Sequence, residues 1–177
     1  MNNLSLSVAQ KADLKIIATI LTEATNYKLD RNDMIWGKES WTKTEVLDMM
    51  HQSTVFVAKR NEEIVGTVSL KWEDKRIWGE QPPTAGYVHR LAVKDTFHGK
   101  NIGKQIIDEL AKYVLENGRS ILRLDCEANN FSLCKYYEKL GFNKVGTMQI
   151  KTNNYNAALY ERLFSASSII SFFKNFI

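Results

Sequence analysis

Residues 87–103 read YVHRLAVKDTFHGKNIG, and this stretch carries more structural information than any other part of the chain. Its apolar first half, residues 87–93, predicts a strand, and the residues from 101 onward predict a helix. A short basic loop that contains Gly99 joins the two. The first N–H groups of a helix have no partners inside the helix and carry partial positive charge. A strand, a glycine-containing loop and a helix N-terminus in this order therefore predict an anion-binding site.

The same loop supplies the groups that bind a phosphate. Gly99 and Gly103 have no Cβ, so the backbone can approach a ligand closely. His98, Lys100 and Lys104 offer hydrogen-bond donors for phosphate oxygens. The spacing matches neither the phosphate loop of nucleotide hydrolases nor the three-glycine fingerprint of dinucleotide-binding proteins. A plain tight turn is the alternative interpretation of the loop taken alone.

The segments on both sides of the loop predict an α/β domain. Strands are expected from β-branched or alternating apolar residues at 4–8, 54–59, 64–72, 87–93, 121–126, 142–150 and 157–163. Helices are expected at 14–24, 42–52, 101–116 and 130–140, the second of them starting with a capping box of Thr42 and Glu45. Residues 27–41 predict a loop or short helices, and residues 73–84 a loop. The fold class is α/β, with a mixed, mostly antiparallel sheet of about seven strands and helices on both faces.

Size and composition restrict the function. The 177 residues suffice for one domain, and 24 basic against 20 acidic residues give a net charge of +4. Because the basic residues are spread along the chain, a nucleic-acid binder is disfavoured. The start of the chain has no signal sequence, and no apolar run reaches the ~20 residues that span a bilayer, so we expect a cytoplasmic protein. Cys126 and Cys134 are expected to be buried free thiols.

The quoted loop resembles the phosphate loop of the GNAT superfamily of acetyl-CoA-dependent N-acetyltransferases. The family pattern is Arg/Gln-x-x-Gly-x-Gly/Ala, and its slots hold His98, Asn101 and Gly103 in this chain. His98 replaces Arg or Gln with another donor. Asn101 replaces the first glycine, which is tolerable because asparagine enters left-handed conformations readily. The preceding residues 89–93, HRLAV, look like the family's fourth strand, whose backbone pairs with the pantetheine arm.

A second stretch resembles the same family. Residues 130–142, NFSLCKYYEKLGF, are similar to the family's Asn-x-x-Ala-x-x-x-Tyr-Glu-x-x-Gly-Phe, with Leu133 where alanine is usual. The resemblance implies that Asn130 hydrogen-bonds the pantetheine or an adjacent water, and that Tyr137 points at the thioester sulfur. It covers roughly residues 4–164, and two motifs in the right order are more specific than either one.

The resemblance implies an enzyme that moves the acetyl group of acetyl-CoA directly to a primary amine, with no metal and no covalent enzyme intermediate. Tyr137 would protonate the departing thiolate, because its hydroxyl is a weak acid. Tyr136 faces about 100° away on the same helix and cannot share that position. The residues implied in acetyl-CoA binding are Leu91, Ala92, Val93, His98, Gly99, Lys100, Asn101, Ile102, Gly103, Lys104, Asn130 and Tyr137.

The sequence identifies the base that deprotonates the amine less clearly than it identifies the acetyl-CoA site. By the strand period of two, His89 shares a face with Tyr87, Leu91 and Val93, and its unperturbed pKa near 6.5 suits proton removal. A structural histidine, the loop carboxylates Glu73 and Glu80, or a chain of waters are the alternatives. Trp36 and Tyr87 are expected to contact the acceptor, whose identity the sequence leaves open.

The chain organisation is expected to be simple. Residues 1–164 would form the GNAT domain, and residues 165–177 an amphipathic tail that packs on it or makes a homodimer contact. The tail has an apolar stripe at helical spacing but a single basic residue, Lys174, which disfavours a membrane-surface role. A non-catalytic sensor of acetyl-CoA is the alternative function, and a DNA- or RNA-binding protein is a third hypothesis.

Overall fold

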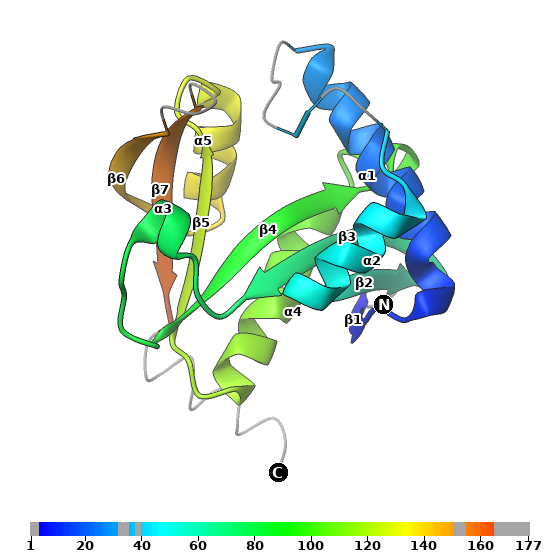
Figure 1. Ribbon diagram of the computed structural model, residues 1–177, viewed down its shortest axis with the longest axis horizontal. Helices are drawn as coiled ribbons and strands as arrows, with labels where there is room; N and C mark the ends of the chain where they lie inside the picture. The colour runs from blue at the N-terminus through cyan, green and yellow to red at the C-terminus, as the bar shows by residue number, and fades with distance from the viewer. Residues whose placement is uncertain (1–3, 32–35, 38–39, 151–154, 165–177) are drawn as a thin grey trace. The chain divides into compact units, whose positions relative to one another are not determined.

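A computed structural model describes residues 4–31, 36–37, 40–150 and 155–164 (Figure 1). Its strands are β1 (Ser5–Val8), β2 (Thr54–Arg60), β3 (Glu63–Lys71), β4 (Ala85–Val93), β5 (Ile121–Glu127), β6 (Asn143–Ile150) and β7 (Tyr155–Leu163). Its helices are η1 (Lys11–Asp13), α1 (Leu14–Leu29), α2 (Lys43–Gln52), α3 (Lys75–Trp78), η2 (Asp95–Phe97), α4 (Ile102–Glu116) and α5 (Phe131–Lys139).

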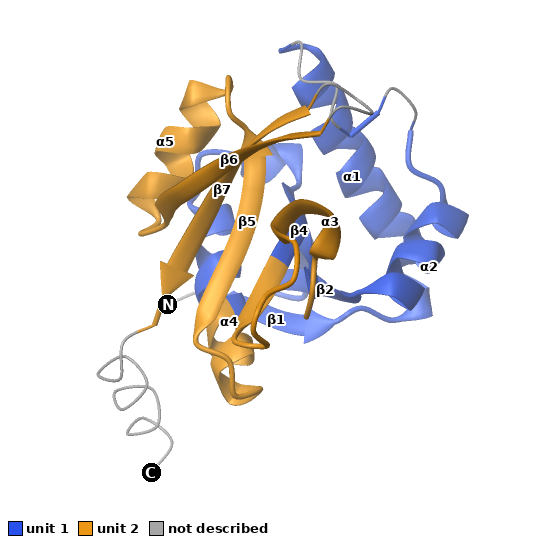
Figure 2. Ribbon diagram, turned by 60° about the vertical axis from the view of Figure 1, so that its left-hand side comes forward, with its two compact units in different colours: residues 1–71, 88–110 blue, residues 72–87, 111–177 orange. Residues whose placement is uncertain are grey.

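The seven strands follow the order β1-β2-β3-β4-β5-β7-β6 in one mixed sheet. β4 and β5 are parallel, whereas β1–β2, β2–β3, β5–β7 and β7–β6 are antiparallel. The predicted fold class is therefore confirmed. The chain divides into two compact units, residues 1–71 with 88–110, and residues 72–87 with 111–177 (Figure 2). We call them unit 1 and unit 2; β4 and α4 contribute residues to both.

Unit 1 has a core between α1, α2 and the sheet. Ile17, Ile20 and Leu21 of α1 are fully buried against Val46 of α2 and Val57 of β2, together with neighbouring apolar residues. α2 begins where the sequence predicts, because Thr42 Oγ1 accepts the Glu45 N–H at 3.2 Å and the Glu45 carboxylate accepts the Thr42 N–H at 2.7 Å. The predicted capping box is therefore confirmed.

The sheet of unit 1 also packs closely on α4. Gly66 of β3 lies against Ile106 of α4 and the backbone of Ala92 in β4, and a Cβ built on Gly66 would meet Ile106 Cδ1 at 2.7 Å. Glycine at this position therefore lets helix and sheet approach. The contact fixes the end of β4 and the start of α4, the two elements that the basic loop connects.

Unit 2 is held together by the antiparallel strands β5, β7 and β6. Leu122 and Leu124 of β5, Tyr160 of β7 and Phe142, which follows α5, are buried in its core. β4 joins this unit through residues 85–87, which pair with residues 121–123 of β5. α5 carries the second sequence motif and packs on β5 through Cys134, which is buried beside Cys126. The prediction of buried free thiols is confirmed.

Four element predictions differ from the structure. α1 continues to Leu29, into the segment expected to be irregular from residue 27. The expected loop 73–84 contains the four-residue helix α3, which is too short to show a helical period in the sequence. β4 starts at Ala85 rather than at residue 87, and β7 starts at Tyr155 rather than at residue 157. The predicted tail, residues 165–177, lies outside the described residues. Among the helices that the structure describes, none has the length and apolar character to span a bilayer.

Candidate active site

The loop between β4 and α4 has the backbone geometry of an anion-binding site. Gly99 and Asn101 adopt positive φ angles of 74° and 58°, so the predicted left-handed conformation of Asn101 is confirmed. The Asn101 carbonyl accepts the first helical hydrogen bond of α4 from the Gln105 N–H at 3.1 Å. The amides of Ile102 and Gly103 precede that bond and therefore belong to the helix N-terminus, where amides lack intrahelical partners.

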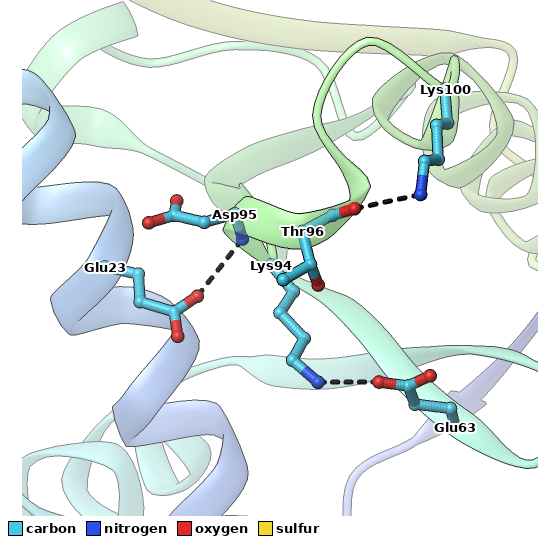
Figure 3. A network of polar contacts seen from close by, with 6 residues as sticks. All are labelled: Glu23, Glu63, Lys94, Asp95, Thr96 and Lys100. Carbon is cyan, nitrogen blue, oxygen red and sulfur yellow. Dashed lines mark hydrogen bonds and ion pairs between the residues drawn. The ribbon is translucent and has the colours of Figure 1, made fainter.

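Two interactions attach this loop to the rest of unit 1 (Figure 3). The Lys94 ammonium is paired with the Glu63 carboxylate of β3 at 2.6 Å. The Asp95 N–H donates to the Glu23 carboxylate of α1 at 3.2 Å. Because β3 and α1 are both packed into the core, these contacts hold the start of the loop in place. Both contacts are made within unit 1.

The two lysines predicted to contact phosphate differ in their surroundings. Lys100 is exposed, and its ammonium donates to the Thr96 carbonyl at 3.0 Å (Figure 3). Lys104 is paired with Asp108 one helical turn later, at 2.5 Å. A neutral carbonyl is a weaker competitor than a carboxylate for an ammonium group. Lys100 is therefore better placed than Lys104 to turn to an anionic ligand.

His98 is engaged within the loop. Its Nε2 lies 3.0 Å from the Val93 carbonyl and 3.6 Å from the Asp95 carboxylate, and its ring meets that of Tyr27 edge-on at 5.3 Å. A carbonyl can only accept, so Nε2 carries the proton. Nδ1 of the neutral ring is then an acceptor. His98 can donate to a phosphate through Nδ1 only as an imidazolium.

The end of β4 departs from the regular strand assumed in the sequence analysis. Arg90 has a left-handed φ of 52°, so the alternation that places Tyr87 and His89 on one face does not continue to residues 91 and 93. The prediction of a single face for these four residues is corrected by this irregularity. Ala92 is buried in the core of unit 1, whereas Leu91 and Val93 are half-buried.

Aromatic side chains surround Arg90 in unit 1. Its guanidinium lies 5.1 Å from the ring centre of Trp36 and 5.0 Å from that of Trp41. Trp36 is partly buried against the core, and Trp41 donates its indole N–H to Thr25 at 3.1 Å. Trp36, the predicted acceptor contact, is thus part of a cation–π cluster, which accounts for its packing without a ligand.

The other predicted residues lie in unit 2. Asn130 caps α5, because its side-chain oxygen accepts the Leu133 N–H at 3.1 Å. The cap uses the oxygen of the Asn130 amide as a hydrogen-bond acceptor. Asn130 therefore starts the helix that carries Tyr137, a structural role that the sequence analysis did not predict.

Tyr137 is half-buried in unit 2, and Tyr136 is exposed. The Tyr137 ring contacts those of Phe142 and Tyr136 edge-on, with ring centres 5.9 and 5.5 Å apart. Burial raises the pKa of the Tyr137 hydroxyl above its usual value, and the nearby Cys126, Tyr136 and Asp125 raise it further. The hydroxyl is therefore protonated at neutral pH and can only lose its proton to a strong acceptor.

A buried cluster around Arg123 was missed by the sequence analysis. Arg123 of β5 is 7% exposed; it donates from Nε to the Glu161 carboxylate at 2.7 Å and from Nη1 to the Tyr87 hydroxyl at 2.8 Å. Its guanidinium also lies 4.9 Å from the ring centre of Trp78. Tyr87 is 3% exposed, which leaves little surface for the direct acceptor contact predicted for it. The one local sign of this cluster in the sequence was an arginine within the mostly apolar run of residues 121–126.

A second missed pair joins β5 to β7. The Tyr155 hydroxyl donates to the Asp125 carboxylate at 2.5 Å. Burial, and then the charge of Asp125, raise the pKa of Tyr155. The two residues are distant in sequence and come together only through strand pairing, so no local pattern could have revealed them.

Known proteins resemble this chain in sequence and in fold. The uncharacterised N-acetyltransferase YesJ of Bacillus subtilis (strain 168) is 27% identical over 145 residues, which cover 76% of this chain and 78% of YesJ. The aminoglycoside acetyltransferase AAC(6')-Ib, solved with coenzyme A, has a TM-score of 0.74 at 16% identity, over 96% of this chain and 98% of that one. The protein yncA of Salmonella typhimurium, solved with its cofactor acetyl-CoA, has a TM-score of 0.68 at 17% identity, over 93% and 96%.

The sequence also matches the model of a protein family. The match to the family described as "Acetyltransferase (GNAT) family" covers residues 21–142. This range includes both stretches that suggested the resemblance, the loop at residues 98–104 and the whole segment at 130–142. The chain therefore belongs to the GNAT family of acetyltransferases and is an acyltransferase enzyme.

Proposed function

We propose that the protein transfers the acetyl group of acetyl-CoA directly to a primary amine. The observation that carries this proposal is the β4–α4 loop, in which left-handed Gly99 and Asn101 lead into the N-terminus of α4. That geometry presents helix amides to an anion, as a coenzyme A pyrophosphate requires. Membership of the acetyltransferase family supplies the reaction class.

In this proposal the loop binds the pyrophosphate of acetyl-CoA. The amides of Ile102, Gly103 and Lys104 donate to its oxygens, and the Lys100 ammonium exchanges the Thr96 carbonyl for a phosphate oxygen. The backbone of residues 91–93 pairs with the pantetheine arm. The structures of AAC(6')-Ib and yncA, which contain coenzyme A and acetyl-CoA, support a coenzyme A thioester as the donor.

The chemistry assigned to Tyr137 is that of a hydrogen-bond and proton donor. The amine nitrogen attacks the thioester carbonyl carbon, the C–S bond then breaks, and the sulfur receives the proton of the Tyr137 hydroxyl. The raised pKa keeps this proton in place at neutral pH but makes its complete transfer harder. We therefore assign Tyr137 an effect of about 10²-fold, at the low end for acid catalysis.

Replacing Tyr137 by phenylalanine tests this assignment. The expected result for Tyr137→Phe is a fall in kcat of about 10²-fold with little change in the KM of acetyl-CoA, since only the hydroxyl is lost. The assay follows release of free coenzyme A thiol with a panel of polyamines, aminoglycosides, amino acids and peptides as acceptors. Tyr136→Phe on the exposed side of α5 is the matched control and should retain full activity. Normal turnover by Tyr137→Phe would show that another group protonates the thiolate.

His89 is proposed as the base that takes a proton from the amine. It is half-buried on β4, and its backbone carbonyl accepts the Ser69 hydroxyl at 3.2 Å, which fixes the strand at this point. An imidazole base must be neutral, so kcat/KM should rise with pH through the pKa of His89. We expect His89→Gln to remove that rise from the pH profile and to lower the plateau. An unchanged profile would favour a chain of waters.

A further inference from the structure

The two cysteines of the chain lie side by side in unit 2. Cys126 is on β5 and Cys134 is on α5, and their sulfur atoms are 3.8 Å apart. Both are free thiols and almost fully covered, with 5% and 8% of their surfaces exposed. A disulfide bond is about 2.05 Å long, so about 1.8 Å separates the observed geometry from a covalent link. Small changes in side-chain torsion and helix position can close that distance.

A shared metal ion is a poorer explanation of this pair. A structural zinc site requires four ligands from cysteine, histidine or carboxylate side chains. Within the part of the chain that the structure describes, the group of side chains arranged to hold a metal includes neither cysteine. The Cys134 sulfur instead faces the backbone carbonyls of Glu127 and Ala128, at 3.8 and 3.9 Å. Among the described residues, the pair is thus a dithiol outside the candidate metal-binding group.

The two cysteines lie in elements of different kind and exposure. Cys126 is held in the ladder between β5 and β7, opposite Ala158. Cys134 lies in α5, a helix of nine residues whose first residue, Phe131, is 72% exposed. Short helices with an exposed side open locally at low cost. We therefore expect an oxidant to reach Cys134 first, and α5 to be the element that moves.

We propose that a peroxide converts Cys126 and Cys134 into a reversible disulfide, and that this disulfide lowers acetyl transfer by displacing Tyr137. The peroxide oxidises the Cys134 thiol to a sulfenic acid and releases one water. The Cys126 thiol then attacks that sulfur, the S–S bond forms, and the second oxygen leaves as water. The protein loses two electrons and two protons, both of which the peroxide takes up. A thiol reductant reverses the reaction.

The link to activity follows from the position of Tyr137. It lies three residues after Cys134, on the same helix, and Cys126 is close enough to Tyr137 to raise the pKa of its hydroxyl. Drawing Cys134 toward β5 must therefore shift or rotate the turn that carries Tyr137. A misplacement of about 1 Å can cost 10²-fold in rate. This consequence, unlike the disulfide itself, rests on the role of Tyr137 in the proposed function.

Peptide mapping tests the disulfide without any activity assay. The purified full chain is treated with hydrogen peroxide, its remaining thiols are alkylated, and it is digested with trypsin and with a protease that cleaves after glutamate. Trypsin leaves both cysteines in residues 124–135, and cleavage after Glu127 separates them. The expected result is a pair of fragments that stay joined, about 2 Da lighter than the sum of the reduced fragments, and separate on reduction. Alkylated thiols in both fragments, or higher oxides without a joined pair, would overturn the proposal.

Activity measurements on the same samples test the switch. Thiol release by the wild-type enzyme should fall at least 10-fold on oxidation and return with dithiothreitol. Cys126→Ser and Cys134→Ser have one thiol each, so neither can form the internal disulfide. Cys134→Ser, which lacks the thiol that is oxidised first, should keep its activity under the same treatment, and in Cys126→Ser dithiothreitol should not reverse any loss caused by higher oxides of Cys134. A joined fragment pair with unchanged turnover would refute the switch. If reduced enzyme had no acetyltransferase activity, the proposed function would fail, while the mapping would still decide whether the disulfide forms.

Discussion

Replacing Gly66 by alanine tests the packing that fixes the end of β4. A Cβ at this position would lie 2.7 Å from Ile106 Cδ1 and 2.9 Å from the Ala92 carbonyl oxygen. Carbon atoms in contact prefer separations of about 3.5–4.0 Å, so both neighbours would have to move by several tenths of an ångström or more. Ile106 is fully buried, and the Ala92 oxygen belongs to the backbone, so neither can yield cheaply.

Overpacking of this kind costs about 1–3 kcal/mol. For a chain of this length each kcal/mol lowers Tm by about 2–4 °C, so Gly66→Ala should melt roughly 2–12 °C below the wild type. The displaced backbone at Ala92 is also proposed to pair with the pantetheine arm. We therefore expect the KM for acetyl-CoA to rise in the same variant. Urea denaturation gives the loss in the free energy of unfolding, and initial rates give KM.

Gly146→Ala is the matched control within β6. Its new Cβ would have Leu159 Cδ1 as its nearest neighbour at 3.8 Å, an ordinary contact. Alanine also reduces the entropy of the unfolded chain, so this variant should be as stable as the wild type or slightly more stable. Equal stability of Gly66→Ala and Gly146→Ala would refute the argument that the close approach of β3, β4 and α4 requires glycine.

Two further predictions concern unit 2. Glu161→Gln should lose about 3–5 kcal/mol of unfolding free energy in urea, because it leaves the buried Arg123 guanidinium without its carboxylate. The control is Glu80→Gln, which breaks the exposed ion pair with Lys75 and should change the free energy of unfolding by less than about 1 kcal/mol. Equal losses in the two variants would contradict the prediction. The pKa values of Tyr137 and Tyr155 are raised in the folded protein, so both hydroxyls keep their protons there above about pH 10, whereas the unfolded chain releases them. The free energy of unfolding should therefore fall as pH rises. Denaturation at pH 8–11 should show a shallower fall for Tyr155→Phe than for the wild type, and identical slopes would argue against the burial of this hydroxyl.

Local sequence patterns were sufficient for most of the fold. The capping box of Thr42 and Glu45 begins α2 as predicted, because both partners lie within one helical turn. The left-handed loop at Asn101 was predictable for a similar reason: the residue itself tolerates that conformation. The strands were found from their β-branched residues, which pack well on a pleated surface whatever their partners are.

Features that depend on contacts between distant segments were not predictable. Arg123 could not be assigned to Glu161 and Tyr87, because strand pairing alone decides which side chains meet. The left-handed Arg90 was missed since arginine has no intrinsic preference for that conformation, and its surroundings of Trp36 and Trp41 come from other elements. The Cys126–Cys134 contact likewise required the packing of α5 on β5.

Calorimetric titration of acetyl-CoA into the purified protein tests the central claim most directly. Desulfo-coenzyme A and ATP serve as comparison ligands, the first because it keeps the pyrophosphate and pantetheine but lacks the sulfur. The account predicts stoichiometric binding of acetyl-CoA and of desulfo-coenzyme A, and much weaker binding of ATP, which lacks the pantetheine arm. It also predicts weaker acetyl-CoA binding when Gly99, which needs a positive φ, is replaced by valine. Absence of acetyl-CoA binding by the wild-type protein would contradict the account, since the loop with His98 and Asn101 would then not be a coenzyme A site.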